Sequence, residues 1–449
     1  MNGIHTRKEA EDLIYRSYLR AVGNIKEKRD AEVRKPELTR KLFRLLGSPD
    51  RGQKFILVAG SKGKGSTARL ISSLLSHLGW KVGLFTSPHL VAFNERIRID
   101  GKAIPDGDFI RLANEILGPF TEIESGLRDD EYQGPIGLAL AVACLWFKEK
   151  NTDINVIECG RGGKFDDVNI LDNEWAVITP VMEEHMTHLG PTMDDVVSHK
   201  LGIIKPKTKF VYVSGQGETL PKIKERMGDL APAHVFYYGE DFFAENISPG
   251  ETGTCFDVRT PRAFYPRLRL SLMGAFQAVN AAVAVKVCED VYGGAIPYQT
   301  ADRCFAAIQW PGRCELIDRN PAVIVDGAIN EKSAAYVKEV IESMGRKNVV
   351  SIVGVPADKD YKGVIRVVSG FSKKLLITSP DISYLTFPAD ALAYARSLTA
   401  RAAEIHPLEA AVKAAMRERD VDAILIVGTQ SLIANAKRLW NQNLMDIGK

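Results

Sequence analysis

A glycine-rich loop between an apolar strand and a helix constrains this chain more than any other feature. Residues 55–59 (FILVA) form an apolar run, residues 58–67 read VAGSKGKGST, and a helical pattern over residues 65–78 stops at Gly79. Glycines have no Cβ, so backbone N–H groups can converge on an anion at the start of the following helix. Strand, glycine turn and helix in this order predict a phosphate-binding loop. Its predicted nucleotide-binding residues are Gly60, Ser61, Lys62, Gly63, Lys64, Gly65, Ser66 and Thr67.

The spacing of this loop departs from the general phosphate-loop pattern. That pattern has glycine where Val58 stands and a hydroxyl residue where Gly65 stands. An ordinary strand-to-helix turn is therefore an alternative interpretation of the glycines alone. In a phosphate loop, Lys64 would reach the terminal phosphates, and Ser66 or Thr67 could ligate a magnesium ion.

Length and composition are those of an α/β protein with two or three domains. The chain has 449 residues, a net charge of +3 and six cysteines without metal-ligand spacing. The near-neutral charge implies no general polyanion-binding surface, so nucleic acid is not an expected partner. The charged N-terminus and the shortness of every apolar run predict a soluble, cytoplasmic protein without a membrane partner. The oligomeric state is not readable from these features, and a monomer is compatible with them.

Strand and helix patterns alternate along the first two thirds of the chain. Buried strands are expected at residues 54–59, 80–86, 154–159, 174–180 and 210–213. Helices are expected within residues 8–48 and at 65–78, 137–149, 194–204 and 276–289. A hairpin is expected near residues 97–101, and the alternation over residues 235–272 predicts an antiparallel β insert.

Pro311 and Gly312 mark the expected linker between two domains, residues 1–311 and 312–449. Beyond the linker, strands are expected at 323–326, 349–353, 374–378 and 424–427, and helices at 331–344, 362–370, 388–398, 408–418 and 430–441. Strands that alternate with helices predict a second parallel, doubly wound sheet.

Three polar residues follow the expected ends of strands in the first domain. Ser87, Glu158 and His185 stand at or close to these carboxyl ends, where ligands of open α/β sheets bind. A carboxylate in such a place can hold a hard cation, and a neutral histidine nitrogen can ligate a metal. The alternatives are that Glu158 caps the glycine turn after it and that His185 is a loop residue like His188 or His199.

Motifs along nearly the whole chain stand in one recognisable order. The most specific are VAGSKGKGSTARL and TSPHLVAFNERIRIDGKAI; NVIECGRGGKFDDVNI, ITPVMEEHMTHLGPTMDDVVSHKLGIIK, GAFQAVNAA, PGRCEL, VIVDGAIN and VGTQSLIA follow. Together they resemble the folylpolyglutamate synthase and dihydrofolate synthase family of the Mur ligase superfamily. The resemblance implies a phosphate-loop ATPase domain with a parallel sheet and a small antiparallel β part. It also implies a C-terminal Rossmann-like α/β domain that helps to bind ATP and an amino acid.

The resemblance implies an ATP-dependent ligase that joins a carboxylate to an amine. Ligases of this kind transfer the γ-phosphoryl group of ATP to the carboxylate, and the amine then displaces phosphate from the acyl phosphate. Metal ions and fixed cations must neutralise the charge that develops. The implied cofactors are ATP and Mg²⁺, and the implied partners are a small-molecule acid acceptor and an amino acid.

The resemblance also implies which residues hold the metal and carry the chemistry. The implied metal ligands are Ser66, Ser87, Glu158, His185 and Lys200, and the implied catalytic residues are Lys64, His185, Lys200, Arg313 and Asp326. Because an ammonium repels magnesium, the family's equivalent of Lys200 is carbamylated, which needs a desolvated amine with a lowered pKa. The alternative is a surface lysine on an amphipathic helix.

The remaining implied contacts are with nucleotide and substrates. Gln277, Asn280, Arg313 and Asp326 are implied to contact the nucleotide. The implied substrate-binding residues are Ser87, Pro88, His89, Ile329, Asn330 and Ser431. Without the resemblance, residues 87–89 would be interpreted as a Ser-Pro turn.

Several residues depart from the family pattern. Ile329 stands where the family has histidine, and Glu331 where it usually has proline. Lys62 replaces asparagine, Phe276 replaces histidine, and Glu184 replaces aspartate. An isoleucine can neither donate a hydrogen bond nor contact a carboxylate, and these changes cluster at catalysis and amino-acid recognition.

There are three alternatives to a folate ligase. The first is a paralogue with the same chemistry on a non-folate acid and a non-glutamate amine. The second is a nucleotide-binding module without catalysis, against which the retained Lys64, Glu158, His185 and Lys200 argue. The third, a generic phosphate-loop kinase or NTPase, does not explain the second α/β domain.

Overall fold

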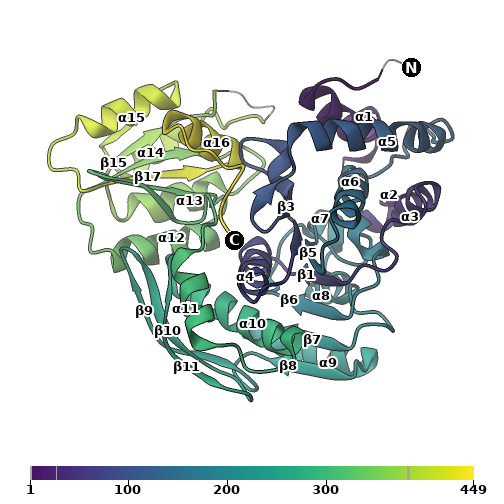
Figure 1. Cartoon of the computed structure of the whole chain (residues 1–449). Helices are drawn as coiled ribbons and strands as arrows, with labels where there is room; N and C mark the ends of the chain where they lie inside the picture. Colours follow the sequence, from purple (N-terminus) through teal and green to yellow (C-terminus); the bar gives the residue numbers. More distant parts are fainter. Residues whose placement is uncertain (1–2, 27, 382–384) are drawn as a thin grey trace.

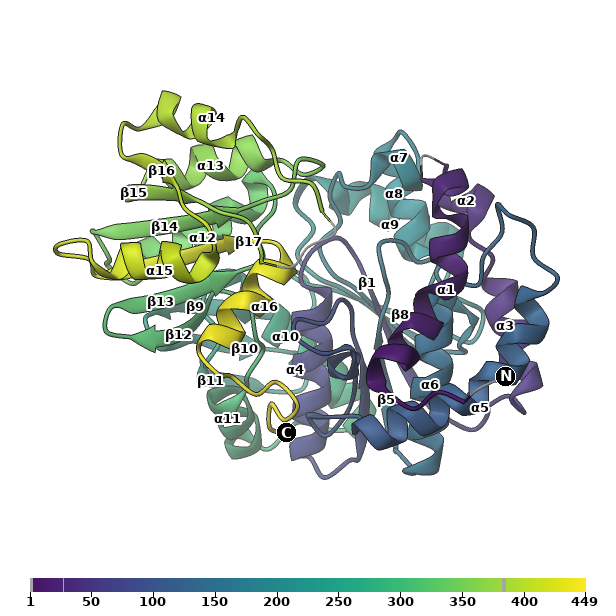
Figure 2. The ribbon, with the colours of Figure 1, turned by 90° about the horizontal axis from the view of Figure 1, so that it is seen from above.

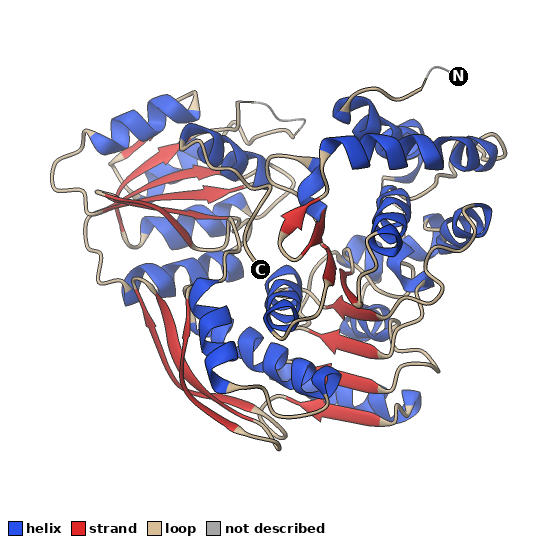
Figure 3. Ribbon diagram, viewed as in Figure 1, coloured by secondary structure: helices blue, strands red, loops and turns tan. Residues whose placement is uncertain are grey.

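The computed structural model describes residues 3–26, 28–381 and 385–449 and contains two α/β parts and a smaller antiparallel sheet (Figures 1 and 3). The first part holds an eight-stranded sheet in the order β4-β3-β2-β5-β1-β6-β7-β8. Its strands are β1 Phe55–Ala59, β2 Val82–Phe85, β3 Ile97–Ile99, β4 Lys102–Ala103, β5 Ile154–Glu158, β6 Trp175–Ile178, β7 Phe210–Val213 and β8 His234–Tyr237. The six strands from β2 to β8 in this order are parallel, and the hairpin β3–β4 extends the sheet antiparallel.

The central strand β1 shows why its sequence is a continuous apolar run. Phe55, Leu57 and Ala59 belong to one core cluster, and Ile56 and Val58 belong to the other. Both faces of the sheet are therefore covered, as a parallel sheet requires.

Helices cover both faces of this sheet. One face is packed by α1 Arg7–Ile25, α3 Pro36–Leu45, α5 Asp106–Glu124 and α6 Pro135–Glu149, and the other by α4 Lys64–His77, α10 Ala275–Tyr292 and α11 Tyr298–Ala307. The remaining helices of this part are α2 Asp30–Val33, α7 Met186–Leu189, α8 Met193–Leu201 and α9 Leu220–Leu230, with short 3₁₀ turns at Phe93–Arg96, Asp167–Ile170 and Gly217–Thr219.

The expected antiparallel insert over residues 235–272 is only partly correct. Strands β9 Phe243–Gly250, β10 Gly253–Arg259 and β11 Phe264–Leu270 form an antiparallel sheet, which packs against α10 and α11. Strand β8, however, pairs parallel with β7 at the edge of the first sheet. Its ring stacking explains this, because Tyr212 of β7 stacks on Phe236 of β8.

The second part holds a six-stranded sheet in the order β12-β13-β17-β14-β15-β16. Its strands are β12 Glu315–Arg319, β13 Ala322–Asp326, β14 Val349–Gly354, β15 Ser372–Ile377, β16 Ala402–Glu404 and β17 Ala423–Gly428. Its helices are α12 Glu331–Ser343, α13 Tyr361–Ser369, α14 Ala391–Leu398, α15 Leu408–Met416 and α16 Gln430–Leu439. Core clusters lie on both faces, so the predicted doubly wound sheet is confirmed, except that β12 pairs antiparallel with β13.

The last residues of the chain return to the first part. Arg69 of α4 donates to the carbonyls of Ile447 (3.0 Å) and Gly448 (2.9 Å). Arg98 donates to the carbonyl of Leu444 at 2.8 Å. The C-terminus accordingly lies beside α4 in both views (Figures 1 and 2). The domain division at Pro311 and Gly312 stays a prediction, and the final residues cross it.

Candidate active site at the junction of the two parts

The loop after β1 requires glycine at two positions. Gly60 has φ +140°, and a Cβ there would lie 2.0 Å from Thr179 Oγ1 and 2.7 Å from the Thr179 carbonyl oxygen. Gly63 has φ +81°, and a Cβ there would lie 2.9 Å from Asn280 Oδ1. Both glycines combine a left-handed backbone with a close approach of a neighbour, which only glycine tolerates.

Two N–H groups of the loop bond to the protein itself, and the next ones along the chain lie at the start of α4. Ser61 and Lys62 donate their N–H groups to the carbonyl of Pro180 at 2.8 and 3.3 Å. The Nζ of Lys64 folds back over the loop and donates to the carbonyls of Gly60 (2.9 Å) and Ser61 (3.3 Å). The N–H groups at the start of α4 are thus the ones placed to bind an anion.

Lys62 lies where charges of both parts meet. Burial lowers the pKa of Lys62, and the carboxylate of Glu184 opposes this shift. Arg313 and Asp326 of the second part also act on the Lys62 ammonium. The loop therefore faces the second sheet across the junction.

Glu158 ends β5 beside the start of α4. The residue is 6 % exposed, and its Oε2 accepts the N–H of Ser87 at 2.9 Å. A Cβ on Gly65 would lie 3.3 Å from the same oxygen. Burial raises the pKa of Glu158, and the ammonium of Lys64 opposes this. A buried carboxylate next to a phosphate loop is suited to a hard cation.

Lys200 points from α8 into the underside of the loop. Its fully buried Nζ donates to the carbonyls of Gly60 (2.7 Å) and Arg161 (2.6 Å) and lies 3.0 Å from Glu184 Oε1. Burial, followed by the charge of Lys64, lowers the pKa of Lys200 to about 8. The alternative of a surface lysine is therefore wrong for Lys200.

His185 stands at the start of α7 with a left-handed backbone, φ 52°. Such a conformation is uncommon for a residue with a Cβ, and residues held in it are over-represented at active sites. The side chain is exposed at the junction, and partial desolvation lowers its pKa below the usual value. Its ring is consequently neutral at pH 7 and free to offer a nitrogen to a metal.

Arg313 and Asp326 face each other in the second part. Asp326 ends β13, and its Oδ2 accepts the N–H of Cys314 at 2.8 Å. Burial raises the pKa of Asp326, and the guanidinium of Arg313 opposes this. A Cβ on Gly327 would lie 3.1 Å from an Arg313 nitrogen, so the guanidinium packs directly over this glycine.

Residues predicted to contact the amine partly serve the fold. Ile329 is half-buried and packs against the apolar core of the second part. Asn330 caps α12, since its Oδ1 accepts the N–H of Ser333 at 2.9 Å. The hydroxyl of Ser431 lies 2.9 Å from that of Thr429, which caps α16.

In the loop after β2, the surroundings of His89 keep its ring neutral. The Nε of Arg96 donates to His89 Nδ1 at 3.0 Å, and burial lowers the pKa of His89 to about 3. The peptide bond before Pro88 is cis. The carboxylate of Glu95 accepts the N–H groups of Leu90, Val91 and Ala92 at 3.1, 2.8 and 2.6 Å. The loop is thus fixed in place beside Glu158.

Polar atoms without a partner gather around the phosphate loop. Asn280 Nδ2 donates to Gln277 Oε1 at 3.0 Å. Among the described residues, Gln277 Nε2, Trp310 Nε1 and Thr67 Oγ1 are buried without a hydrogen bond. Trp310 covers the loop, since its ring would lie 3.1 Å from a Cβ on Gly65. Buried polar atoms left unpaired commonly mark the place of a ligand.

Comparisons with known proteins agree with this geometry. Residues 58–288 match the family model of the Mur ligase middle domain, and residues 312–430 match that of the Mur ligase, glutamate ligase domain. The dihydrofolate synthase/folylpolyglutamate synthase of Bacillus subtilis is 32 % identical over 80 % of this chain and 83 % of its own length. The chain belongs to the folylpolyglutamate synthase/dihydrofolate synthase family of Mur ligases. The resemblance inferred from the sequence is therefore confirmed.

Other relatives and several solved structures are also similar to this Mur ligase. The Mycobacterium tuberculosis protein of the same name is 30 % identical over 76 % of this chain and 74 % of its own length. Among solved structures, M. tuberculosis folylpolyglutamate synthase complexed with ADP has a TM-score of 0.86 at 24 % identity, covering 97 % of this chain and 99 % of that one. The apo form of L. casei FPGS has a TM-score of 0.83 at 22 % identity, covering 98 % and 100 %. At these identities the solved structures are evidence for the fold alone, and this fold is the one predicted from the sequence.

Mur ligases of this family are ATP-dependent enzymes that form an amide bond, and ATP and Mg²⁺ are their cofactors. The residues of the candidate site fit both ATP and Mg²⁺. The glycine cradle and the unpartnered Thr67 Oγ1 suit phosphate and metal, and the buried carboxylate of Glu158 has the chemistry of a hard-cation ligand. No helix of the described residues is long and apolar enough to cross a membrane.

The structure brings most predicted residues of this Mur ligase to one junction and adds others. Glu184 is the carboxylate that pairs with Lys200, and Trp310 is the ring over the loop. Their sequence neighbourhood gave only a weak signal: Glu184 as a departure beside His185, and Trp310 as the residue before the predicted linker. A contact between residues far apart in the sequence, such as that of Trp310 with Gly65, becomes visible only in the folded structure.

Proposed function

We propose that this Mur ligase joins the carboxylate of a folate-type acid to the amino group of an amino acid. The observation that carries the proposal is the meeting of the phosphate loop with Arg313 and Asp326, whose charges act on Lys62. A junction of this kind can hold the phosphates, the acid and the amine together, which lowers the entropic part of the barrier. The names of the relatives, which refer to dihydrofolate and to folylpolyglutamate, support a folate-type acid.

Lys64 is proposed as the cation on the terminal phosphates of ATP. Its two present hydrogen bonds go to neutral loop carbonyls. Phosphate oxygens offer charge-assisted bonds, which are stronger, so Lys64 can exchange partners without a change of position of its backbone. Lys62 brings a second positive charge from the same loop, and Arg313 brings one from the other part. Gln277 and Asn280 would bind elsewhere on the nucleotide.

Magnesium, when bound, neutralises charge on the phosphates. Glu158, Ser66 and Ser87 would supply hard oxygen ligands, and His185 would supply a neutral nitrogen. Among the described residues no three His, Cys, Asp or Glu side chains cluster in metal-binding range. The proposed set therefore depends on hydroxyl oxygens and on Lys200.

Lys200 is proposed to act as a carbamate. Carbon dioxide adds to a neutral amine, and the lowered pKa of about 8 leaves roughly a tenth of the side chain neutral at pH 7. A carbamate would stand beside the carboxylate of Glu184, so two anions would share the place that one ion pair holds now. A divalent cation between them would remove this repulsion.

A second candidate function uses the same chemistry with an amine other than glutamate. Ile329 is aliphatic and contacts the apolar core of the second part, so it offers no charge partner to a side-chain carboxylate. His89, Asn330 and Ser431 are proposed to complete the acid and amine sites. Weak activity with glutamate and better activity with another amino acid are therefore expected.

The test is ADP release by the whole chain with ATP, Mg²⁺ and a folate-type acid, against a panel of all amino acids. Product formation that needs both the acid and the amine would support the ligase, and the best amine would decide between the two candidates. Ile329→His should raise kcat/KM for glutamate, with Ile329→Val as the matched control that keeps the site apolar. Efficient addition of glutamate by the unmodified chain would reject the second candidate only. ADP release that is independent of every acid offered would reject the folate proposal.

A further inference from the structure

A cavity of about 210 Å³ opens in the second part at the carboxyl ends of three neighbouring strands. Val353 lies at the end of β14, Ile377 at the end of β15 and Glu404 at the end of β16. Open α/β sheets bind ligands at this edge. None of the residues that line the cavity belongs to the nucleotide, metal or substrate sites described above.

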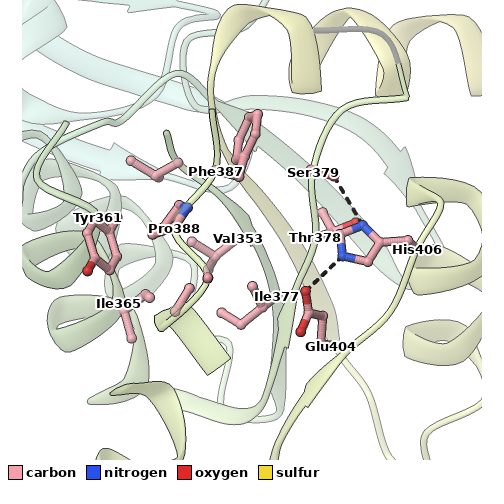
Figure 4. A pocket seen from close by; sticks show the side chains of 13 residues that line it. Val353, Tyr361, Ile365, Ile377, Thr378, Ser379, Phe387, Pro388, Glu404 and His406 are labelled. Atoms are coloured by element: carbon pink, nitrogen blue, oxygen red, sulfur yellow. Dashed lines mark hydrogen bonds and ion pairs between the residues drawn. The ribbon is translucent and has the colours of Figure 1, made fainter. Parts of the chain in front are cut away.

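The walls of the cavity are apolar on one side. In Figure 4, Tyr361 and Ile365 lie on the side opposite His406, with Phe387, Pro388 and Val353 between them. The Tyr361 hydroxyl donates to Asp390 at 2.6 Å and is therefore already used. These side chains suit the apolar part of a small ligand. An engineered apolar cavity of about 150 Å³ binds benzene, so a single ring fits here.

The rim of the cavity presents hydrogen-bond acceptors. His406 Nε2 lies 3.0 Å from Glu404 Oε1, and its Nδ1 lies 3.1 Å from Ser379 Oγ (Figure 4). The carboxylate can only accept, so Nε2 carries the hydrogen; in the neutral ring, Nδ1 then accepts from the Ser379 hydroxyl. The groups that remain available to a ligand are the free lone pairs of Ser379 Oγ and of the Glu404 carboxylate. Such a rim attracts a donor or a cation and repels an anion.

We propose that this cavity is a second ligand site, separate from the ligase site, for a small amine with a single-ring or branched apolar body. The apolar walls would hold the body of the amine, and Glu404 with Ser379 would accept hydrogen bonds from its ammonium group. This inference does not depend on which acid or amino acid the ligase joins.

Three probes of the same size and different charge test the site on the full chain by calorimetry. Benzylamine should bind, benzyl alcohol should bind more weakly, and benzoate should not bind. Glu404→Gln should weaken benzylamine about tenfold, the effect of losing one charge-assisted bond, and should leave benzyl alcohol unchanged. Glu409→Gln is the matched control, since Glu409 is an exposed carboxylate of α15 that pairs with Lys413 outside the cavity.

Two further measurements separate this site from the ligase site. A saturating non-hydrolysable ATP analogue and the variant Lys64→Ala should leave benzylamine affinity unchanged. The proposal is overturned if benzoate binds as well as benzylamine, if Glu404→Gln does not weaken benzylamine binding, or if the ATP analogue displaces the probe. Because Glu404 is exposed, its replacement does not put the fold at risk.

Discussion

Lys200 should react with carbon dioxide far more readily than an ordinary lysine of the same chain. Only the neutral amine attacks carbon dioxide; a new N–C bond forms, and the amine releases a proton. Burial and the nearby Lys64 lower the pKa of Lys200 from 10.5 to about 8. At pH 7 the neutral fraction is therefore about 300-fold larger than for a solvent-exposed lysine, and it should rise about fivefold between pH 7 and pH 8.

The carbamate can be measured directly by carbon NMR. The full chain is equilibrated with ¹³C-bicarbonate, Mg²⁺ and a non-hydrolysable ATP analogue, and the carbamate signal is followed from pH 6 to pH 9. A signal that grows with pH and is absent in Lys200→Met is the expected result. Ligase activity should be lost in Lys200→Met and should depend on bicarbonate in the unmodified chain.

Lys205 provides the matched control for this experiment. Burial also lowers the pKa of Lys205 to about 8, so its neutral fraction is the same. Its ammonium, however, donates to the carbonyls of Asn169 (2.9 Å) and Leu171, away from the loop, so neither Lys64 nor bound Mg²⁺ would stabilise a carbamate there. Lys205→Met should keep the carbamate signal and the bicarbonate dependence. No signal in the unmodified chain, or a signal lost in Lys205→Met instead of Lys200→Met, would refute the reasoning.

Three other perturbations have defined outcomes. Lys64→Ala should lower kcat/KM by at least about 10²-fold, since it removes a cation placed for the transition state, and ADP release measures this; near-normal activity would place the phosphate site elsewhere. Gly60→Ala should lower the free energy of unfolding by about 1–3 kcal/mol and weaken nucleotide binding, because its Cβ would overlap Thr179; unchanged denaturant unfolding would contradict the strain argument. Closure about Pro311 and Gly312 should reduce the radius of gyration when the ATP analogue and acid bind, and an identical small-angle scattering profile under saturating ligands would count against a hinge.

Local patterns in the sequence were sufficient for the strands, the loop and most helices. The run at residues 55–59 predicts a buried strand because β1 has a helix layer on each face, and Gly60 and Gly63 predict a tight loop because their backbones have positive φ. The strand and loop predictions rest on local physics that acts within a few residues. The shared metal site of Glu158 and Lys200, in contrast, was implied only by the resemblance to the ligase family.

Features that depend on distant partners could not be obtained in this way. The strand β8 was expected in the antiparallel insert, but stacking of Phe236 on Tyr212 places it in the parallel sheet. The return of residues 444–448 to α4 depends on Arg69 and Arg98, which lie hundreds of positions earlier. The helix-capping role of Asn330 was hidden because a capping residue and a ligand-binding residue have the same polar side chain.

The central claim is that this chain phosphorylates a carboxylate and passes it to an amine, and the transfer of oxygen tests it most directly. The acid substrate is labelled with ¹⁸O in both carboxylate oxygens and incubated with ATP, Mg²⁺ and the best amino acid. One labelled oxygen attacks the γ-phosphorus and leaves with it when the amine forms the amide bond. Mass spectrometry should therefore find one ¹⁸O in the released phosphate, one in the amide product, and ADP as the nucleotide product. Phosphate without label, or release of AMP in place of ADP, would contradict the account.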